Sequence, residues 1–294
     1  MKLEYVLITA ARNEEAYIER TIQSVISQTI LPKKWVIISD GSMDRTDEIV
    51  LKYAKETDWI ELMRMPERKE RHFAGKVHAF NAGCYKVKNL AYDIIGNIDA
   101  DISFNEDFFE YLLNKFEIMP ELGVAGTDYI EGEFHSFKDS YINVNHVNGQ
   151  CQLFRRQCFE EIGGYIPIKE GGIDWVAVTT ARMKGWKTYS FSEKTYTHHG
   201  VMGRTYGNIL SIRFKYGKKD YFLGGDPVWQ IFRAAFQITK KPYVIGGFCL
   251  LLGYFWSLVT RVERPISKEL MRFTRQEQMK RLKQLLSNRL MLNR

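Results

Sequence analysis

The chain has 294 residues, of which 45% are hydrophobic and 26% charged, which is a globular composition and excludes an intrinsically disordered protein. The net charge is +7, but residues 228–294 hold thirteen Lys or Arg and three Asp or Glu, a local charge of +10 that leaves −3 for residues 1–227. This distribution argues against a nucleic-acid-binding core and favours an anionic partner surface for the C-terminal part.

The first hundred residues alternate between apolar runs and helical patterns. Strands are expected near 5–13, 35–39, 60–65 and 92–101, with helices between them. Such alternation predicts an α/β fold, with a mostly parallel, Rossmann-like sheet covered by helices on both faces. The N-terminus has no signal-peptide pattern and the four cysteines form no CxxC pair, so we expect a reducing cytoplasm.

Polar side chains follow the predicted strands at the points where they end. Ligands of parallel α/β sheets bind beyond the carboxyl ends of the strands, so residues far apart in sequence should converge on one rim. The residues concerned are Thr9, Arg12, Asn13, Glu14, Asp40, Asp99 and Asp101.

Asp99 and Asp101 lie in the segment "NIDAD", directly after an apolar run. Two carboxylates at positions i and i+2 can share one Mg²⁺ or Mn²⁺ ion, which prefers oxygen ligands and often binds substrate phosphates as well. A solvated turn is the alternative for an isolated pair. The apolar run that leads into it favours the metal.

The remaining part of the first domain is mixed in pattern. A helix is expected near 174–184, followed by a turn at Gly185 and a strand, and a loop then carries the adjacent His198 and His199. Imidazole is a common ligand of Mn²⁺-type ions, and neighbours on an extended segment point opposite ways, so we expect only one His to face a metal. A packed or surface His is the alternative.

Residues 242–260 form an uncharged run of nineteen residues with lysines before it and arginines after it. The run is marginal for a membrane span, which needs about 20 apolar residues, so we expect a helix that lies in or re-enters the membrane interface. A buried helix is the alternative. One or two basic amphipathic helices should follow, and we therefore expect a domain at 1–227 and a helical, membrane-associating appendage at 228–294.

Five segments, in this order, resemble the inverting family 2 glycosyltransferases with the GT-A fold, over roughly residues 3 to 200. The segments are "LITAARNEE", "ISDGSMDRT", "GKVHAFNAG", "NIDAD" and "GGIDWVAVTTARMKGWK". The resemblance implies that a nucleotide-sugar donor binds in the first half of the chain, with Thr9 and Glu14 at the base and ribose and Asp40 on the base. The other donor-binding residues it implies are Ala10, Arg12, Lys76, Asn81 and Asp99.

The resemblance also implies the catalytic groups. Asp101 would bind Mn²⁺ or Mg²⁺, with Asp99 and either His198 or His199 as further ligands. Asp174 would be the general base that deprotonates an acceptor hydroxyl, although it could also be only the N-cap of its helix. Ile173 stands where the family has a Glu, which Glu170 could replace. Arg204 would contact the leaving diphosphate.

These features predict a glycosyltransferase that moves one sugar from a nucleotide-sugar, with UDP favoured over GDP or dTDP, to a glycan or lipid-linked acceptor of surface polysaccharide synthesis. No QxxRW-like element of processive synthases occurs. The expected location is the cytoplasmic face of the inner or plasma membrane, as a peripheral or monotopic protein. The alternatives are a sugar-nucleotide nucleotidyltransferase and a non-catalytic membrane-surface adaptor.

Overall fold

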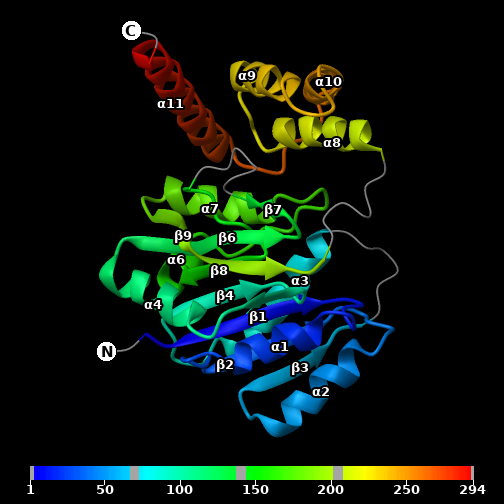
Figure 1. Ribbon diagram of the computed structural model, residues 1–294, viewed down its shortest axis with the longest axis vertical. Coiled ribbons are helices and arrows are strands. Elements are labelled where there is room, and N and C mark those ends of the chain that lie inside the picture. The colour runs from blue at the N-terminus through cyan, green and yellow to red at the C-terminus, as the bar shows by residue number, and fades with distance from the viewer. Residues whose placement is uncertain (1–2, 67–72, 137–143, 201–207, 293–294) are drawn as a thin grey trace. The chain divides into compact units, whose positions relative to one another are not determined.

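The computed structural model describes residues 3–66, 73–136, 144–200 and 208–292 (Figure 1). The chain forms two compact units, Met1–Val201 and Met202–Arg294. We expected the division at residue 227. It lies earlier because helix α8 (Ile209–Phe222) packs against α10 (Ile245–Val259) and so belongs to the second unit.

The first unit is built on a nine-stranded sheet with the order β3-β2-β1-β4-β8-β6-β9-β5, and β7 pairs with β6. Its first half is parallel, as predicted: β1 (Tyr5–Ala11) pairs with β2 (Lys34–Ser39) and β4 (Ile94–Ile98), and β2 pairs with β3 (Ile60–Arg64). These strands alternate with helices, which is the connection that parallel pairing requires.

The second half makes the sheet mixed. Strand β8 (Cys151–Arg155) runs antiparallel to β4 and to β6 (Leu122–Glu131), and β6 runs parallel to β9 (Lys187–His198). Two short strands, β5 (Ile102–Phe104) and β7 (Phe134–His135), add antiparallel pairs to β9 and β6. The α/β fold with helices on both faces is confirmed, and the antiparallel insertion of β8 extends it.

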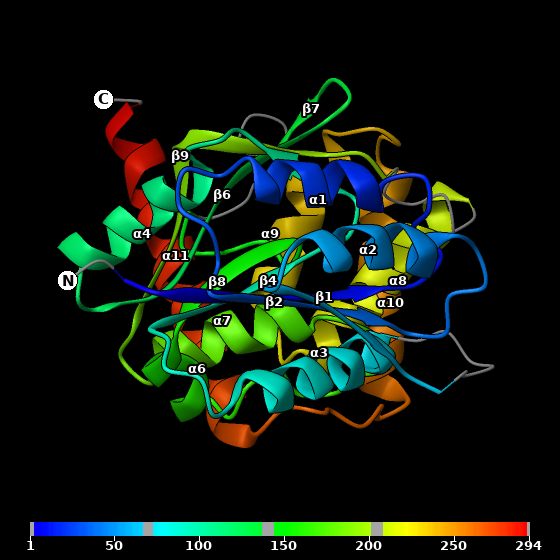
Figure 2. The ribbon, with the colours of Figure 1, turned by 90° about the horizontal axis from the view of Figure 1, so that it is seen from below.

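Helices cover both faces of the sheet (Figure 2). One face carries α1 (Ile18–Ile26), α2 (Thr46–Glu56) and α4 (Phe108–Ile118). The other carries α3 (Phe73–Val87), α6 (Arg156–Glu161) and α7 (Ile173–Met183).

Alternation along β1 connects the two layers. Tyr5 and Leu7 are fully buried in the cluster that contains the apolar residues of α1 and α4. Ile8 points to the other face, where a Cβ on Gly83 of α3 would overlap its side chain. Both faces of the strand are therefore buried, which explains why it reads as a continuous apolar run.

The second unit consists of α8, α9 (Pro227–Ile238), α10 and α11 (Lys268–Leu292). The Asn208 and Asp226 side chains cap α8 and α9 by accepting the Leu210 and Val228 backbone N–H groups. The basic C-terminal segment forms a single helix, α11. No helix in the described part of the chain is both long enough and apolar enough to cross a membrane.

Two glycines bring α8 and α10 into backbone contact. A Cβ on Gly253 would overlap the carbonyl oxygen of Phe214, and a Cβ on Gly217 would overlap that of Leu250. Neither neighbour is a flexible side chain, so the helices could accept a larger residue only by separating.

We expect Gly253→Ala to destabilise the second unit by about 1–3 kcal/mol, because the added methyl group forces α8 away from α10. Thermal unfolding followed by circular dichroism measures this loss. Gly246→Ala is the matched control on the same helix, since its Cβ would lie 3.3 Å from Pro242 and meets no backbone atom. Equal stability of the two variants would contradict the close packing.

Candidate active site

The strand directions bring the predicted polar residues to one edge of the sheet. Strands β1, β2, β4, β6 and β9 all run toward this edge, and β8 starts from it because it is antiparallel to β4 (Figure 1). Asp40, Asp99, Glu131 and His198 all lie at or just beyond the ends of these strands. The convergence expected from the sequence is therefore present.

Lys76 in the first turn of α3 forms an ion pair with Asp99 after β4. Burial lowers the pKa of Lys76, but the negative charge of Asp99, supported by Asp174 and Asp101, outweighs it and raises the pKa above its usual range. Burial raises the pKa of Asp99, and Asp101 acts in the same direction while Lys76 opposes it. Lys76 is thus the cation that balances a group of carboxylates.

Asp101 contacts His198, the last residue of β9. Its Oδ2 lies 3.1 Å from His198 Nε2, and the other ring nitrogen, Nδ1, lies 2.8 Å from Glu131 Oε2 at the end of β6. Burial lowers the pKa of His198, but the hydrogen bond and charge of Asp101, together with Glu131, raise it to about 9. The imidazole is therefore held in one orientation between two carboxylates.

Of the two histidines, His198 contacts the Asp101 carboxylate, whereas the His199 ring contacts other side chains. Its Nε2 lies 2.8 Å from Ser103 Oγ, and its ring stacks on Tyr17 at 6.2 Å between centroids. Its backbone N–H donates to the Asp101 carbonyl oxygen at 2.8 Å. Burial and the charge of Arg20 lower the pKa of its imidazole. His199 positions the Asp101 backbone.

Asp174 lies in the first turn of α7, where its side chain covers Gly149. A Cβ on Gly149 would lie 2.7 Å from the Asp174 Cβ and 3.1 Å from its Oδ2. The segment that holds Gly149 is fixed to β4, since the Asn97 side chain donates to the Gly149 carbonyl oxygen at 2.7 Å and the Asp99 N–H donates to the Gln150 carbonyl oxygen at 2.8 Å. Asp174 is not the N-cap, which is Gly172 with φ 90°.

The loops after β1 and β2 form one hydrogen-bonded rim. The Asp40 N–H donates to the Ala11 carbonyl oxygen at 2.8 Å, and the Glu14 N–H donates to Thr46 Oγ1 at 2.7 Å. Asn13 has φ 57°, and its side chain accepts the Met43 N–H at 2.9 Å. Ala10, Arg12 and Glu14 are half-buried on this rim and Asp40 is buried, so four predicted donor-binding residues share one surface.

Thr9 requires a correction, because its side chain does not reach the rim. It is fully buried, and its Oγ1 accepts the indole N–H of Trp35 at 3.0 Å. The hydroxyl therefore satisfies a buried donor of the core. Asn81 is exposed on α3, five residues beyond Lys76 and so about 140° around the helix, and the structure does not bring it to the acidic cluster. Arg204 lies outside the described residues.

Sequence reasoning missed Glu131 and the small residues around the cluster. Glu131 ends an apolar strand, as Asp99 nearly does, and this signal could have identified it. A Cβ on Gly200 would overlap Asp101 Oδ2 and lie 3.2 Å from His198 Nε2, so a larger residue would displace the Asp101 carboxylate from its present position. No sequence signal separates Gly149 and Gly200 from other loop glycines.

The same contacts bear on whether a metal ion can bind at this edge of the sheet. Among the residues that the structure describes, no group of three or more His, Cys, Asp or Glu side chains is arranged to hold an ion alone. Asp101 Oδ2 and His198 Nε2 lie 3.1 Å apart, which is a hydrogen-bonded contact between a carboxylate and an imidazole. These two donor types are ones that Mn²⁺ accepts, so the chemistry of the pair fits an ion that takes its other ligands from a substrate.

A mixed α/β sheet with strand-end carboxylates on one edge is the architecture of a GT-A glycosyltransferase. The model of the family "Glycosyl transferase family 2" matches residues 6–167, which is more than half of the chain. The chain belongs to this family.

Several known proteins are similar to the chain. Poly-beta-1,6-N-acetyl-D-glucosamine synthase of Staphylococcus aureus (strain COL) is 32% identical over 175 residues, which cover 53% of this chain and 40% of the synthase. The enzyme of the same name from Staphylococcus epidermidis is 26% identical over 179 residues, with the same coverage. The chain thus spans about two fifths of the length of these curated relatives.

Solved structures share the fold. Mannosyltransferase PcManGT from Pyrobaculum calidifontis, in complex with GDP-Man and Mn²⁺, has a TM-score of 0.56 at 18% identity and covers 88% of this chain and 73% of its own. S. aureus TarS 1-349 in complex with UDP-GlcNAc has a TM-score of 0.56 at 13% identity, and the match covers 92% of this chain and 78% of the TarS chain. At such identities the likeness confirms the GT-A fold alone.

We expect Thr9→Val to destabilise the protein by about 1–3 kcal/mol, because it leaves the buried Trp35 N–H without an acceptor. Urea unfolding measures the change in the free energy of unfolding. In a Trp35→Phe variant, which has no indole N–H, Thr9→Val should lower the free energy of unfolding by less. Loss of nucleotide binding at unchanged stability would restore Thr9 to the site.

Proposed function

We propose that the protein is a metal-dependent, inverting glycosyltransferase that transfers one sugar from a nucleotide-sugar donor to a glycan hydroxyl. The observation that carries this proposal is the single acidic cluster that joins Lys76–Asp99, Asp101–His198–Glu131 and Asp174 at the ligand-binding edge of the sheet. Family membership favours a transferase over the nucleotidyltransferase and adaptor alternatives.

Asp101 and His198 would hold Mn²⁺ or Mg²⁺. Glu131 accepts from the Nδ1 of His198 and so fixes the tautomer in which Nε2 can bind a metal, as carboxylates commonly do for metal-ligating histidines. A bound ion would neutralise charge on the donor diphosphate. Asp99 retains Lys76 as its partner, which supports a role beside the ribose or sugar over a direct metal contact.

Asp174 would accept the proton of the attacking hydroxyl. It lies at the start of α7, beside Gly149, and its charge reaches Lys76, so it belongs to the same cluster as the donor groups. In-line attack from its side at the anomeric carbon would invert that centre, with the acceptor oxygen bond forming as the bond to the diphosphate breaks. Glu170 is exposed four residues earlier and could contact the acceptor.

A UDP-sugar is the proposed donor, and UDP-GlcNAc is the first to test. The support is that the curated relatives are poly-beta-1,6-N-acetyl-D-glucosamine synthases and that TarS binds UDP-GlcNAc. PcManGT binds GDP-Man, so GDP- and dTDP-sugars belong in the same screen. A lipid-linked glycan of surface polysaccharide synthesis is the proposed acceptor, and the cytoplasmic face of the inner or plasma membrane is the proposed location.

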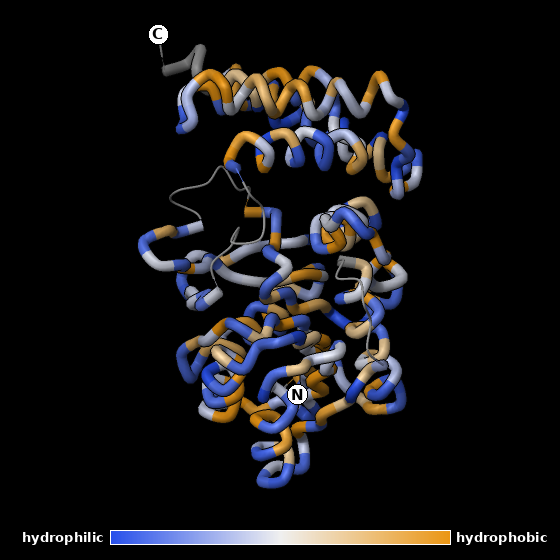
Figure 3. Tube along the Cα trace, turned by 90° about the vertical axis from the view of Figure 1, so that its right-hand side faces the viewer, coloured by the Kyte–Doolittle hydropathy of each residue, from blue (hydrophilic) through white to orange (hydrophobic). Residues whose placement is uncertain are grey.

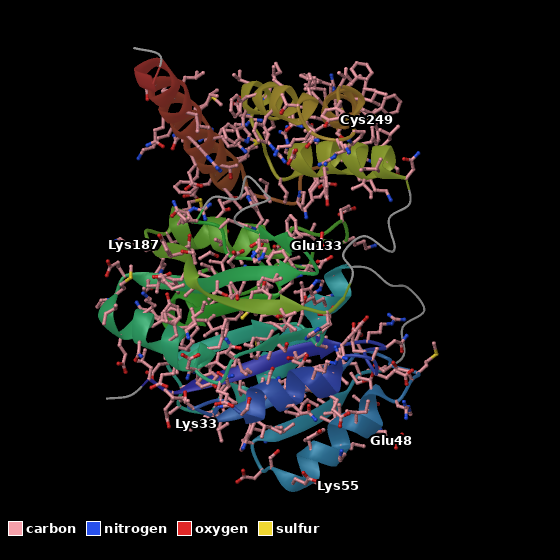
Figure 4. All side chains as sticks on the ribbon, in the orientation of Figure 1. Lys33, Glu48, Lys55, Glu133, Lys187 and Cys249 are labelled. Atoms are coloured by element: carbon pink, nitrogen blue, oxygen red, sulfur yellow. The ribbon has the colours of Figure 1, made fainter. Side chains whose placement is uncertain are left out.

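We expect Asp174→Asn to lower the turnover rate by a factor of about 10² to 10⁴, since the amide cannot accept the hydroxyl proton. Calorimetry should show UDP binding unchanged, because the donor groups lie on other elements. Glu48→Gln on α2 (Figure 4) is the matched acid-to-amide control and should retain full turnover. Normal turnover in Asp174→Asn would assign the base to another residue.

We expect Asp101→Asn to abolish the Mn²⁺-dependent part of UDP binding, and Glu131→Gln to weaken Mn²⁺ about 10–100-fold, because it releases the His198 ring. The measurement is the rise in melting temperature with UDP over a series of Mn²⁺ concentrations. Glu133→Gln, an exposed neighbour, is the control. An unchanged Mn²⁺ dependence in Asp101→Asn would place the ion elsewhere.

A further inference from the structure

Helix α10 carries apolar residues on two opposite sides. One side is buried and includes Gly246, Leu250, Gly253 and Tyr254. The other side is exposed and consists of Ile245, Phe248, Leu252, Trp256 and Val259. We name this exposed set the outward stripe of α10.

Packing among the described residues of the second unit accounts for the buried side. Gly253 meets the Phe214 backbone of α8, and Gly247 meets the Ala234 backbone of α9. The outward stripe lies on the opposite side of the helix, with its members three or four residues apart. Exposure of 60% for Trp256 and 79% for Val259 shows that these side chains face solvent.

The apolar surface continues beyond α10. Tyr243 and Val244, in the turn before it, are 59% and 60% exposed. Helix α9, which packs beside α10, presents exposed apolar residues at Val228, Ile231 and Ile238. Apolar residues recur along the helices of this unit in Figure 3, and the side chains of α10 project around the labelled Cys249 in Figure 4. Contiguous exposed apolar surface of this kind marks an interaction site.

Positive charge surrounds this surface. Lys240 and Lys241 precede Tyr243, and Arg261 follows the last turn of α10; all three side chains are exposed. Residues 202–294 contain eighteen Lys or Arg and five Asp or Glu, a net charge of +13, whereas residues 1–201 carry −6. Of this charge, Lys240, Lys241 and Arg261 lie next to the two ends of α10.

We propose that the outward stripe of α10, with Tyr243 and Val244, docks on an anionic lipid surface. The 15 residues of α10 span about 22 Å, less than the roughly 30 Å of a bilayer core, so the helix lies in the interface plane. The flanking lysines and arginine then reach lipid phosphates. A second copy is the poorer occupant, because a symmetric contact would bring two clusters of positive charge together. The proposal does not depend on the transferase activity.

Trp256 provides a direct test in the unmodified full-length protein. All six tryptophans are described, and Trp256 alone is exposed. With vesicles of equal parts phosphatidylglycerol and phosphatidylcholine, we expect the protein to co-sediment and its tryptophan emission to shift to the blue. Brominated lipids should quench this emission. In Trp256→Phe both optical signals should disappear while sedimentation persists.

Variants then separate the apolar and ionic contributions. Phe248→Asp/Leu252→Asp should weaken vesicle binding by about a hundredfold, because both side chains leave the acyl region. Lys240→Gln/Lys241→Gln should weaken it about tenfold on anionic vesicles only. The matched controls are Met43→Asp and Lys55→Gln, both in the first unit. The Met43 side chain is 80% exposed and Lys55 lies exposed on α2, so both variants should bind vesicles normally.

Three results would overturn the proposal. The first is absence of vesicle binding by the full chain. The second is equal binding to pure phosphatidylcholine and to anionic vesicles. The third is a dimer in light scattering that Phe248→Asp/Leu252→Asp converts to monomer without any change in vesicle binding. Hydrolysis of a UDP-sugar, which releases free sugar and UDP, should be unaffected by these stripe variants, so a failed docking test leaves the proposed function intact.

Discussion

The constraint on which the site depends is the concentration of negative charge at one edge of the sheet. Asp99 and Asp101 follow β4, Glu131 ends β6 and Asp174 lies in the first turn of α7, so three parts of the chain bring four acids together. Two like charges about 4 Å apart repel by about 4 kcal/mol at an effective dielectric constant of 20. Two basic side chains offset this repulsion: Lys76 pairs with Asp99, and the His198 ring lies between Asp101 and Glu131. These two partners also set the chemistry, because they decide which carboxylate retains the capacity to bind something else.

This charge arrangement explains why backbone and glycine contacts matter around the cluster. Gly149 and Gly200 leave room for Asp174 and Asp101 where any Cβ would collide with the carboxylate. His199 donates its backbone N–H to the Asp101 carbonyl oxygen, which fixes the end of β4 to the end of β9. The carboxylates are thus positioned at strand ends and at the start of α7 by specific backbone contacts, as a preorganised polar site requires.

Much of this could be predicted from the sequence, for physical reasons. The parallel half follows from alternating strand and helix periods, and the gathering of Asp40, Asp99 and Asp101 follows from parallel strands that end together. The antiparallel strand β8 could not be predicted, since pairing partners are tertiary choices. The error at Thr9 has the same origin: β1 is buried on both faces, so no alternation showed which side chains point inward. The contacts of the His199 ring could not be predicted either, because the ring meets Ser103, which lies nearly a hundred residues earlier in the chain.

In the second unit, the sequence alone left two interpretations of one helix open. The uncharged run in α10 was ambiguous because a buried helix and an interfacial helix share that composition. The structure divides the helix into two sides: Gly253 and Gly247 account for one side of α10 through backbone contact, and Phe248, Leu252 and Trp256 on the other side are exposed among the described residues of the unit. Apolar side chains that remain exposed to water are unfavourable, and their transfer into an apolar phase lowers the free energy. In the docking that we propose, anionic lipid would supply both that phase and the countercharge for the residues that flank the helix.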